Sequence, residues 1–278
     1  MIPLSIGFSP CPNDTFIFNR LVHSSPLEGE PVFGSPYLED VETLNQWAFE
    51  QRLDITKLSC HAAGHVLDDY CLLPSGGALG HGCGPLLVAR HNCPAAELVG
   101  KKIAIPGEFT TAAMLFRMFL PDCTDLVVMR FEQIMEAVST GEVSAGVIIH
   151  ESRFTYQDKG LCCLQDLGQW WEESSGMPIP LGCIGVRRSL GRALIADIDR
   201  QVKASLDWAR KNYEEGFPYI REHAQETEMK VIRSHINLYV NDFSYDLGVD
   251  GRMAVETFFS RARQEKILPE SAQPVFCL

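Results

Sequence analysis

The chain has 278 residues, of which 46% are hydrophobic, and a formal net charge of −12 at pH 7. A chain of this length and composition can bury one large or two medium cores, which excludes an extended disordered protein. The acidic balance argues against a nucleic-acid partner, because such binding depends on clustered Lys and Arg. A net negative charge is still compatible with a local anion-binding site.

The N-terminal stretch MIPLSIGFSPCPND carries no basic leader and ends in turn-forming residues. We therefore interpret it as a first strand rather than a signal peptide. No apolar run approaches the roughly 20 residues that a membrane-spanning helix needs. These features predict a cytoplasmic protein with no membrane partner.

The ten cysteines form no CxxC pair and no repeated spacing. A chain of this size needs no disulfide to hold its core, so we predict reduced, mostly buried thiols. A structural zinc site is a minor alternative. We expect neither a metal nor an organic cofactor.

Short apolar or β-branched runs alternate with helical patterns along most of the chain. The runs predict strands over 4–8, 55–59, 86–89, 102–105, 126–130 and 145–149. Helices are predicted over 14–22, 41–51, 111–119, 132–140 and 197–210, and the last fifth of the chain is almost entirely helical. This alternation is typical of βαβ units and largely parallel sheets.

Composition changes near residues 89–98 and again near 177–181, where MPIPL precedes another apolar run. We interpret both changes as places where the chain passes from one lobe to another. They predict a discontinuous first lobe, 1–90 plus 182–278, with 91–181 inserted as a second lobe. Lobes joined in this way close on a ligand between them. A single doubly wound domain with decorations is equally compatible with the composition.

In open α/β sheets, ligands bind beyond the carboxyl ends of strands, where helix N-termini offer free N–H groups. Four polar segments have that position, the fourth of them beginning at His150. In the first, Ser9 and Asn13 follow the first strand, and Asn13 or Asp14 is also suited to cap the next helix. An ordinary capped loop is the plainer interpretation of this segment.

The second segment is Lys57-Leu58-Ser59, where alternation turns Lys57 and Ser59 to one face of a strand toward the same anion. A solvated lysine beside a capping serine is the alternative. The third is Thr110-Thr111, whose hydroxyls open an amphipathic helix and can cradle a carboxylate or only cap the helix.

His150 is the first polar residue after the apolar strand AGVII. A lone histidine is usually structural, but an imidazole at the mouth of a buried strand is placed to act as a base near neutral pH. Glu151 or a backbone carbonyl can orient its ring. Cys11, inside the first segment, is expected to have a packing role.

The glycine-rich segment 76–85 lacks the order of a nucleotide-binding loop, so its glycines more simply permit close backbone approach. The remaining histidines show no metal-ligand spacing, and no GxSxG elbow supports a Ser–His–Asp triad.

Several segments together resemble the 1,4-dihydroxy-6-naphthoate synthase family of the futalosine route to menaquinone. They are SPCPNDTFIF at 9–18, GCGPLLV at 82–88, FTT at 109–111, HESRFTY at 150–156, PIPLGCIG at 178–185 and HINLYVNDFSYDLG at 235–248. The resemblance covers essentially the whole chain.

The resemblance implies a two-lobed α/β fold of the periplasmic-binding-protein type II kind. It also implies a carbon–carbon lyase that converts cyclic dehypoxanthine futalosine to 1,4-dihydroxy-6-naphthoate without a cofactor. His150 would be the proton acceptor, and residues 57–59 with Thr110 and Thr111 would contact a carboxylated small-molecule substrate. Ser152 stands where the family pattern has glycine, and His61 and His65 replace small or aromatic residues.

Two other classes share this fold. A non-catalytic small-anion-binding protein would be expected to carry an export leader, and a transcription regulator would need a basic helix-turn-helix segment. Neither is visible in the sequence. The oligomeric state stays open, with a homodimer as one option.

Overall fold

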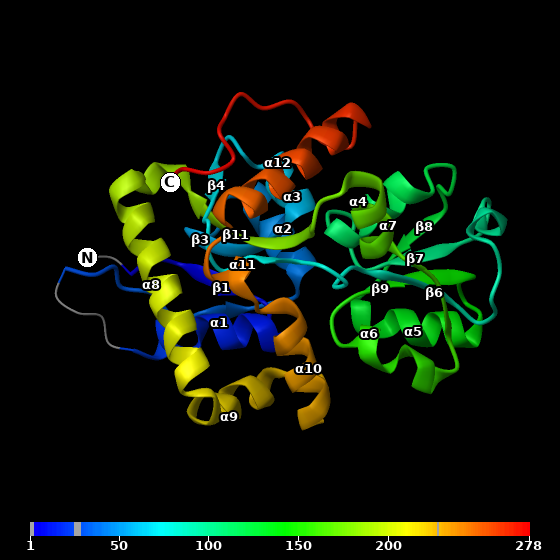
Figure 1. Ribbon diagram of the computed structural model, residues 1–278, viewed down its shortest axis with the longest axis horizontal. Coiled ribbons are helices and arrows are strands. Elements are labelled where there is room, and N and C mark those ends of the chain that lie inside the picture. Colours follow the sequence, from blue (N-terminus) through cyan, green and yellow to red (C-terminus); the bar gives the residue numbers. More distant parts are fainter. Residues whose placement is uncertain (1–2, 25–28, 227) are drawn as a thin grey trace.

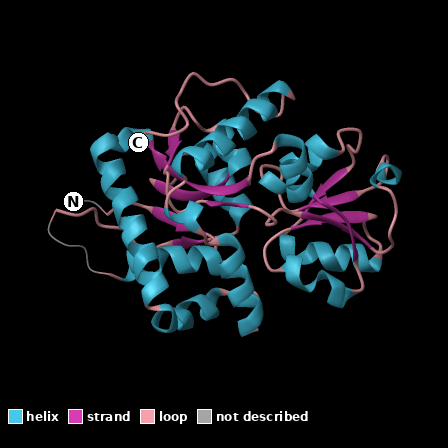
Figure 2. Ribbon diagram, in the orientation of Figure 1, coloured by secondary structure: helices cyan, strands magenta, loops and turns pink. Residues whose placement is uncertain are grey.

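The computed structural model describes residues 3–24, 29–226 and 228–278. Within them the chain forms two α/β units, each built on its own sheet (Figure 1). Helices flank both sheets, as Figure 2 shows. Both ends of the described chain lie with the larger unit.

The larger sheet has the order β2-β1-β3-β11-β4, with β5 also paired to β11. Its strands come from both halves of the chain: β1 Ile6–Phe8, β2 Tyr37–Leu38, β3 Ile55–Ser59, β4 Tyr70–Leu72, β5 Ala78–Gly80 and β11 Ile179–Arg187.

The smaller sheet has the order β10-β6-β9-β7-β8. Its strands are consecutive in the chain: β6 Leu86–Ala89, β7 Ile103–Ile105, β8 Leu126–Val128, β9 Ala145–Ile148 and β10 Cys162–Asp166. The chain therefore passes to the smaller sheet after β5 and returns in β11. Strand β6, which we expected in the first lobe, pairs in this second sheet. The division into lobes at 90 and 182 stays a prediction.

The expectation of largely parallel sheets is wrong, because both sheets are mixed. Strand β11 runs antiparallel to β3, β4 and β5. Strand β6 runs antiparallel to both β9 and β10. The parallel pairs are β1 with β2 and β3, and β7 with β8 and β9. The strands that carry the chain between the units cause the reversal, since each enters its sheet from the opposite end.

The twelve helices of the described chain include all five that the sequence predicts. Those are α1 Pro12–His23, α2 Val41–Phe49, α4 Thr111–Phe119, α5 Phe131–Thr140 and α8 Arg192–Lys211. The others are α3 Cys60–His65, α6 Ser152–Thr155, α7 Leu167–Ser175, α9 Tyr213–His223, α10 Met229–Tyr239, α11 Asp242–Tyr245 and α12 Gly248–Gln264, with 3-10 turns at Ala95–Leu98, Tyr156–Lys159 and Arg188–Leu190.

Helix α4 illustrates how the local sequence sets a boundary. Thr110 caps it by accepting the Ala113 N–H at 3.2 Å. The following residues are almost entirely buried, so their packing stabilises the helix beyond its capped first turn. Helices α4 and α7 cover one face of the smaller sheet and α5 the other (Figure 1).

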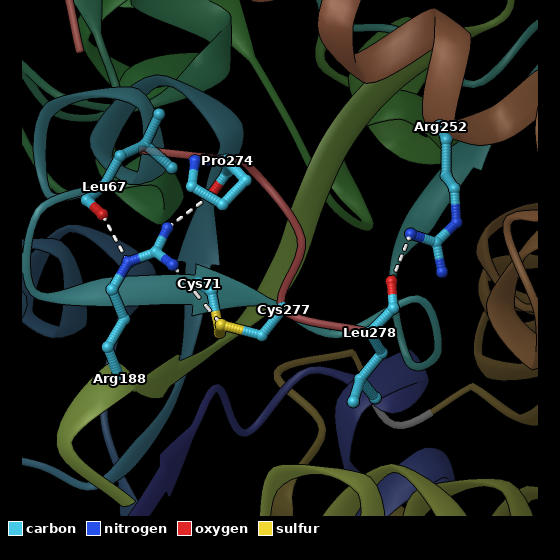
Figure 3. The surroundings of a disulfide bond; sticks show 7 residues. All are labelled: Leu67, Cys71, Arg188, Arg252, Pro274, Cys277 and Leu278. Carbon is cyan, nitrogen blue, oxygen red and sulfur yellow. Dashed lines mark hydrogen bonds between the residues drawn. A yellow bond between two sulfur atoms is a disulfide. The ribbon is translucent and has the colours of Figure 1, made fainter. Parts of the chain in front are cut away.

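A disulfide joins Cys71 in β4 to Cys277 near the C-terminus, which overturns the prediction of ten reduced thiols. Figure 3 shows the tail lying beside β4, where Arg188 donates to the Leu67 and Pro274 carbonyls and to the Cys277 sulfur. This pairing spans 206 residues and arises from the tertiary fold, so no local cysteine spacing announces it. The other eight cysteines are free.

No helix among the described residues has the length and apolarity to cross a bilayer. The apolar N-terminal stretch instead contributes β1, in which Ile6 and Phe8 are fully buried.

Candidate functional site

A pocket opens between the two sheets, and all eight residues that the sequence singled out line it. They are Ser9, Asn13, Lys57, Leu58, Ser59, Thr110, Thr111 and His150. Residues outside that prediction complete the wall: Asp14, Val41, Ala78, Cys83, Pro85, Ala112, Ile149, Leu181, Gly182 and Tyr239. Both sheets thus contribute loops to one pocket, which is the arrangement expected of a ligand site in this fold class.

The Lys57 ammonium is neutralised inside the protein. Its Nζ lies 2.9 Å from Asp14 Oδ1 and donates to the Gly76 carbonyl at 2.8 Å. Both side chains of the ion pair are almost completely buried. Lys57 therefore contributes one end of a dipole to the pocket wall rather than an isolated positive charge.

Asp14 is the centre of the first polar segment. It accepts hydrogen bonds from the Ser9 amide and hydroxyl and from Asn13 Nδ2. The expectation that Asn13 or Asp14 caps the helix is wrong, because α1 begins at Pro12 with Cys11 as its N-cap residue. Asn13 and Asp14 lie inside the first turn and point into the polar network.

Ser59 is held by Asn45 of helix α2. The Asn45 amide accepts the Ser59 N–H at 3.0 Å and donates to the Ser59 hydroxyl at 3.2 Å. It also donates to the Phe109 carbonyl at 3.3 Å. Glu42 accepts the Phe109 N–H with both carboxylate oxygens, at 3.1 and 3.2 Å. Helix α2 therefore ties the Thr110 loop to the end of β3.

The two threonines have different partners. The Thr110 hydroxyl donates to the Gly107 carbonyl while it caps α4, so it acts within its own loop. The Thr111 hydroxyl donates to the Leu181 carbonyl in β11 at 2.6 Å. The first N–H groups of a helix have no partner within the helix, so the start of α4 offers donors to an anion in the pocket.

His150 lies two residues beyond the end of β9, with a left-handed backbone (φ 55°) that is uncommon outside glycine. Its half-buried ring contacts Phe131 edge-on and lies parallel to the ring of His235, with 6.1 Å between centroids. Loss of hydration lowers the pKa of His150 to about 4. The imidazole is therefore neutral near pH 7 and available as a base.

Behind His150 lies a buried group that the sequence indicated only in part. Ligand atoms of Cys11, His150 and Glu151 lie within 4.8 Å of one another, close enough to hold a metal ion together. His235 from α10 completes the group, with its Nδ1 4.0 Å from Glu151 Oε2. Burial raises the pKa of Cys11 well above its ordinary value and that of Glu151 to about 7.

His61 and His65, which depart from the family pattern, pack beside the site. Their rings contact each other and Phe109, and His61 Nδ1 donates to the Thr110 carbonyl at 3.2 Å. Burial lowers the pKa of His61 to about 3, so its ring is a neutral spacer under the Thr110 loop.

The residues that sequence reasoning missed are supporting ones: Asp14, Glu42, Asn45 and His235. Asp14 was considered only as a helix cap, and His235 was quoted within a family motif without a role. Glu42 and Asn45 belong to helix α2, whose polar residues would be expected from the sequence to form a solvent-exposed face. Only the tertiary fold turns these side chains toward the pocket loops.

Comparison with known proteins places these features in a family. A family model described as menaquinone biosynthesis matches residues 4–264. A 1,4-dihydroxy-6-naphthoate synthase of Thermus thermophilus is 49% identical over 99% of this chain and 100% of its own. The enzyme of the same name from Streptomyces coelicolor is 45% identical over 96% of this chain and 95% of its own.

Solved structures agree on the fold. Protein AF1704 from Archaeoglobus fulgidus has a TM-score of 0.89 at 31% identity, covering 96% of this chain and 98% of its own. The alkanesulfonate-binding protein SsuA of Xanthomonas axonopodis pv. citri has a TM-score of 0.69 at 12% identity, covering 97% and 95%. The fold is thus the two-lobed α/β fold of periplasmic binding proteins, and the chain belongs to the menaquinone-biosynthesis family of 1,4-dihydroxy-6-naphthoate synthases.

Proposed function

We propose that this chain is a carbon–carbon lyase that converts cyclic dehypoxanthine futalosine to 1,4-dihydroxy-6-naphthoate. The observation that carries the proposal is a neutral imidazole, His150, on the wall of a pocket that Ser59 and the start of α4 also line. Relatives with 45–49% identity over nearly the full length bear the name of this activity.

The substrate has an aryl carboxylate and a spiro-fused remnant of ribose. In the proposed binding mode, the carboxylate is held by Ser59 and by the start of α4 at Thr110 and Thr111. The Lys57–Asp14 pair, with Ser9 and Asn13, faces the hydroxyls of the sugar remnant. These placements use hydrogen-bond donors that already line the pocket.

The proposed reaction starts when His150 removes a proton from the sugar-derived ring. The electron pair left behind forms a double bond within the sugar-derived fragment as the carbon–carbon bond to the spiro centre breaks. The electrons of the broken bond enter the bicyclic ring, which becomes the aromatic naphthoate, takes up a proton and releases the sugar-derived fragment; aromatisation drives the cleavage. General-base assistance of this kind contributes about 10² to 10⁴ in rate. Closure of the two units over the substrate would exclude water during the step.

We propose in addition that the chain acts in the cytoplasm. The biosynthetic activity for which its relatives are named supports this. The acidic composition is compatible with that location.

The test is to incubate the purified chain with cyclic dehypoxanthine futalosine at neutral pH and to follow the naphthoate by chromatography. The proposal requires catalytic turnover of the substrate. Tight binding without product, measured by calorimetry in the same buffer, would instead indicate a small-anion-binding protein of the same fold.

A further inference from the structure

Glu151 is a carboxyl group buried without a counter-ion. Its side chain is 2% exposed, and neither of its oxygens has a hydrogen-bond partner among the described residues. The Nδ1 atom of His235 lies 4.0 Å from Glu151 Oε2. His235 is itself fully buried, and its Nδ1 also lacks a hydrogen-bond partner in the described chain.

The hydrogen bonds around His235 fix where its proton is. The Asp14 carboxylate is ion-paired with Lys57 and can only accept, so the group of Asn13 that faces it at 2.8 Å is the amide nitrogen. The Asn13 oxygen then faces His235 Nε2, also at 2.8 Å. His235 must donate from Nε2, and in the neutral ring its Nδ1 is an unprotonated lone pair.

The His235 lone pair lies 4.0 Å from Glu151 Oε2, and it can accept a hydrogen bond from that carboxyl group only when the carboxyl is protonated and the two groups move closer together. An ionised Glu151 would place two acceptors face to face in a buried site, which is costly. A protonated Glu151 has one O–H for His235 Nδ1 and keeps its carbonyl oxygen as an acceptor. A carboxyl oxygen of Glu151 lies within 4.8 Å of a ring nitrogen of His150, which makes this ring a candidate donor to the carbonyl oxygen.

We infer that Glu151 is held as a neutral acid by His235 and is a positioning residue for His150, accepting its N–H so that the other ring nitrogen faces the pocket. This inference rests on the proposed function, in which His150 is the base. The separations are those of the ligand-free site, and such contacts commonly tighten when substrate binds.

The surroundings favour the neutral form. The titratable groups that face Glu151 are Cys11 before α1, His150 after β9, and His235 and Tyr239 on α10, with Glu132 of α5 and Glu226 farther away. Burial, followed by the two more distant carboxylates, raises the pKa of Glu151 to about 7. Glu151 therefore loses its proton, and with it the ability to donate to His235, as the pH rises through about 7.

The main experiment compares Glu151→Leu and Glu151→Gln by steady-state kinetics over a range of pH. The Leu variant removes the group that would accept the His150 N–H. We therefore expect kcat to fall about 10²-fold with little change in KM, because misplacement of a reacting group has effects of this size. The Gln variant has an N–H for His235 and a carbonyl for His150. It is expected to restore most of the lost kcat.

The pH profile separates positioning from mere packing. Wild-type kcat is expected to decline above about pH 7 as Glu151 ionises. The Gln variant, which cannot ionise, is expected to lose this decline. Glu132→Gln is the matched control, because it removes one of the more distant charges that raise the pKa of Glu151, so its alkaline decline should persist and move to a lower pH.

A second readout needs no turnover. Infrared difference spectra of wild type against Glu151→Gln should show the C=O stretch of a protonated carboxyl group about one pH unit below 7 and its loss above. Nitrogen NMR of labelled wild type should report His235 protonated at Nε2 and unprotonated at Nδ1. Both measurements can be made even if the wild type forms no naphthoate. Failure of the proposed function can therefore be distinguished from failure of this inference.

Three results would overturn the inference. The first is an alkaline decline that persists in Glu151→Gln, and the second is a Gln variant as inactive as the Leu variant. The third is one equivalent of a metal ion that co-purifies with wild type and is lost in Glu151→Gln, since a metal shared by Cys11, His150 and Glu151 requires the ionised carboxylate.

Discussion

The Lys57 ammonium and the Asp14 carboxylate lie 2.9 Å apart, with side-chain exposures of 5% and 3%. Removing one partner of such a buried pair leaves the other charge uncompensated, which costs about 3–5 kcal/mol. Lys57→Met is therefore expected to lower the free energy of unfolding by about that amount. Urea unfolding of the variant and of wild type measures the difference.

The double variant Lys57→Met/Asp14→Asn is the control. Because it removes both charges, it should recover most of the stability lost in Lys57→Met. If the single variant were as stable as wild type, the pair would not be the buried ion pair described above.

Asn45 joins the end of β3 to the Thr110 loop, although we do not expect it to contact the substrate. Asn45→Ala removes the bonds to Ser59 and to the Phe109 carbonyl, so both pocket loops lose a common support. We expect KM to rise more than kcat falls. Gln46, the exposed neighbour on the same helix, supplies the matched control in Gln46→Ala. Equal kinetics of the two variants would argue against a role of Asn45 in shaping the pocket.

His61 makes the protein sensitive to acid. Its pKa is about 3 in the fold and 6.5 ordinarily, so between these values only the unfolded chain binds its proton. Stability therefore falls as the pH drops below 6.5, by up to about 1.4 kcal/mol per pH unit for this group.

His61→Phe should flatten the dependence of unfolding free energy on pH by about one proton, measured by urea unfolding between about pH 7 and about pH 5. His150 has the same sign, with a pKa of about 4, and would leave part of the slope in place. An unchanged slope in His61→Phe would show that the ring is protonated in the fold.

The Cys71–Cys277 disulfide fastens the C-terminal tail to β4. Thiol labelling of the unfolded, non-reduced protein should find eight free cysteines of ten. Cys277→Ser should destabilise the protein by about 2–4 kcal/mol under oxidising conditions. Cys93→Ser, which changes a free thiol, should have little effect. Labelling of ten thiols would mean that the bond does not form in solution.

Local patterns were sufficient to predict many of the elements. Strands β3 and β6 and helix α4 have the predicted bounds, because their apolar runs and caps are contiguous in the sequence. Strands β2, β4, β5, β10 and β11 were not predicted. Strands β2, β4 and β5 have only two or three residues, and β10 and β11 pair with strands far along the chain. The same reason explains the wrong expectation of largely parallel sheets, since strand direction depends on where the chain re-enters each unit.

In the pocket, too, some features follow from the local sequence and others only from the tertiary fold. The polar segments after strands could be predicted to lie near a ligand, because strand ends gather at one edge of a sheet. Their partners could not be predicted from the sequence. Asp14 neutralises Lys57 from 43 positions away, and His235 approaches Glu151 from a helix near the other end of the chain. Side chains that act on one another through the fold have no shared local spacing.

The role of His150 as the base of a lyase can be tested by comparing wild type with His150→Asn on cyclic dehypoxanthine futalosine. This assignment predicts that, on the acid side, wild-type kcat/KM declines below about pH 4, where His150 becomes protonated. It also predicts that His150→Asn binds the substrate but forms naphthoate at least about 10²-fold more slowly. A folded His150→Asn variant with the wild-type rate would contradict the claim.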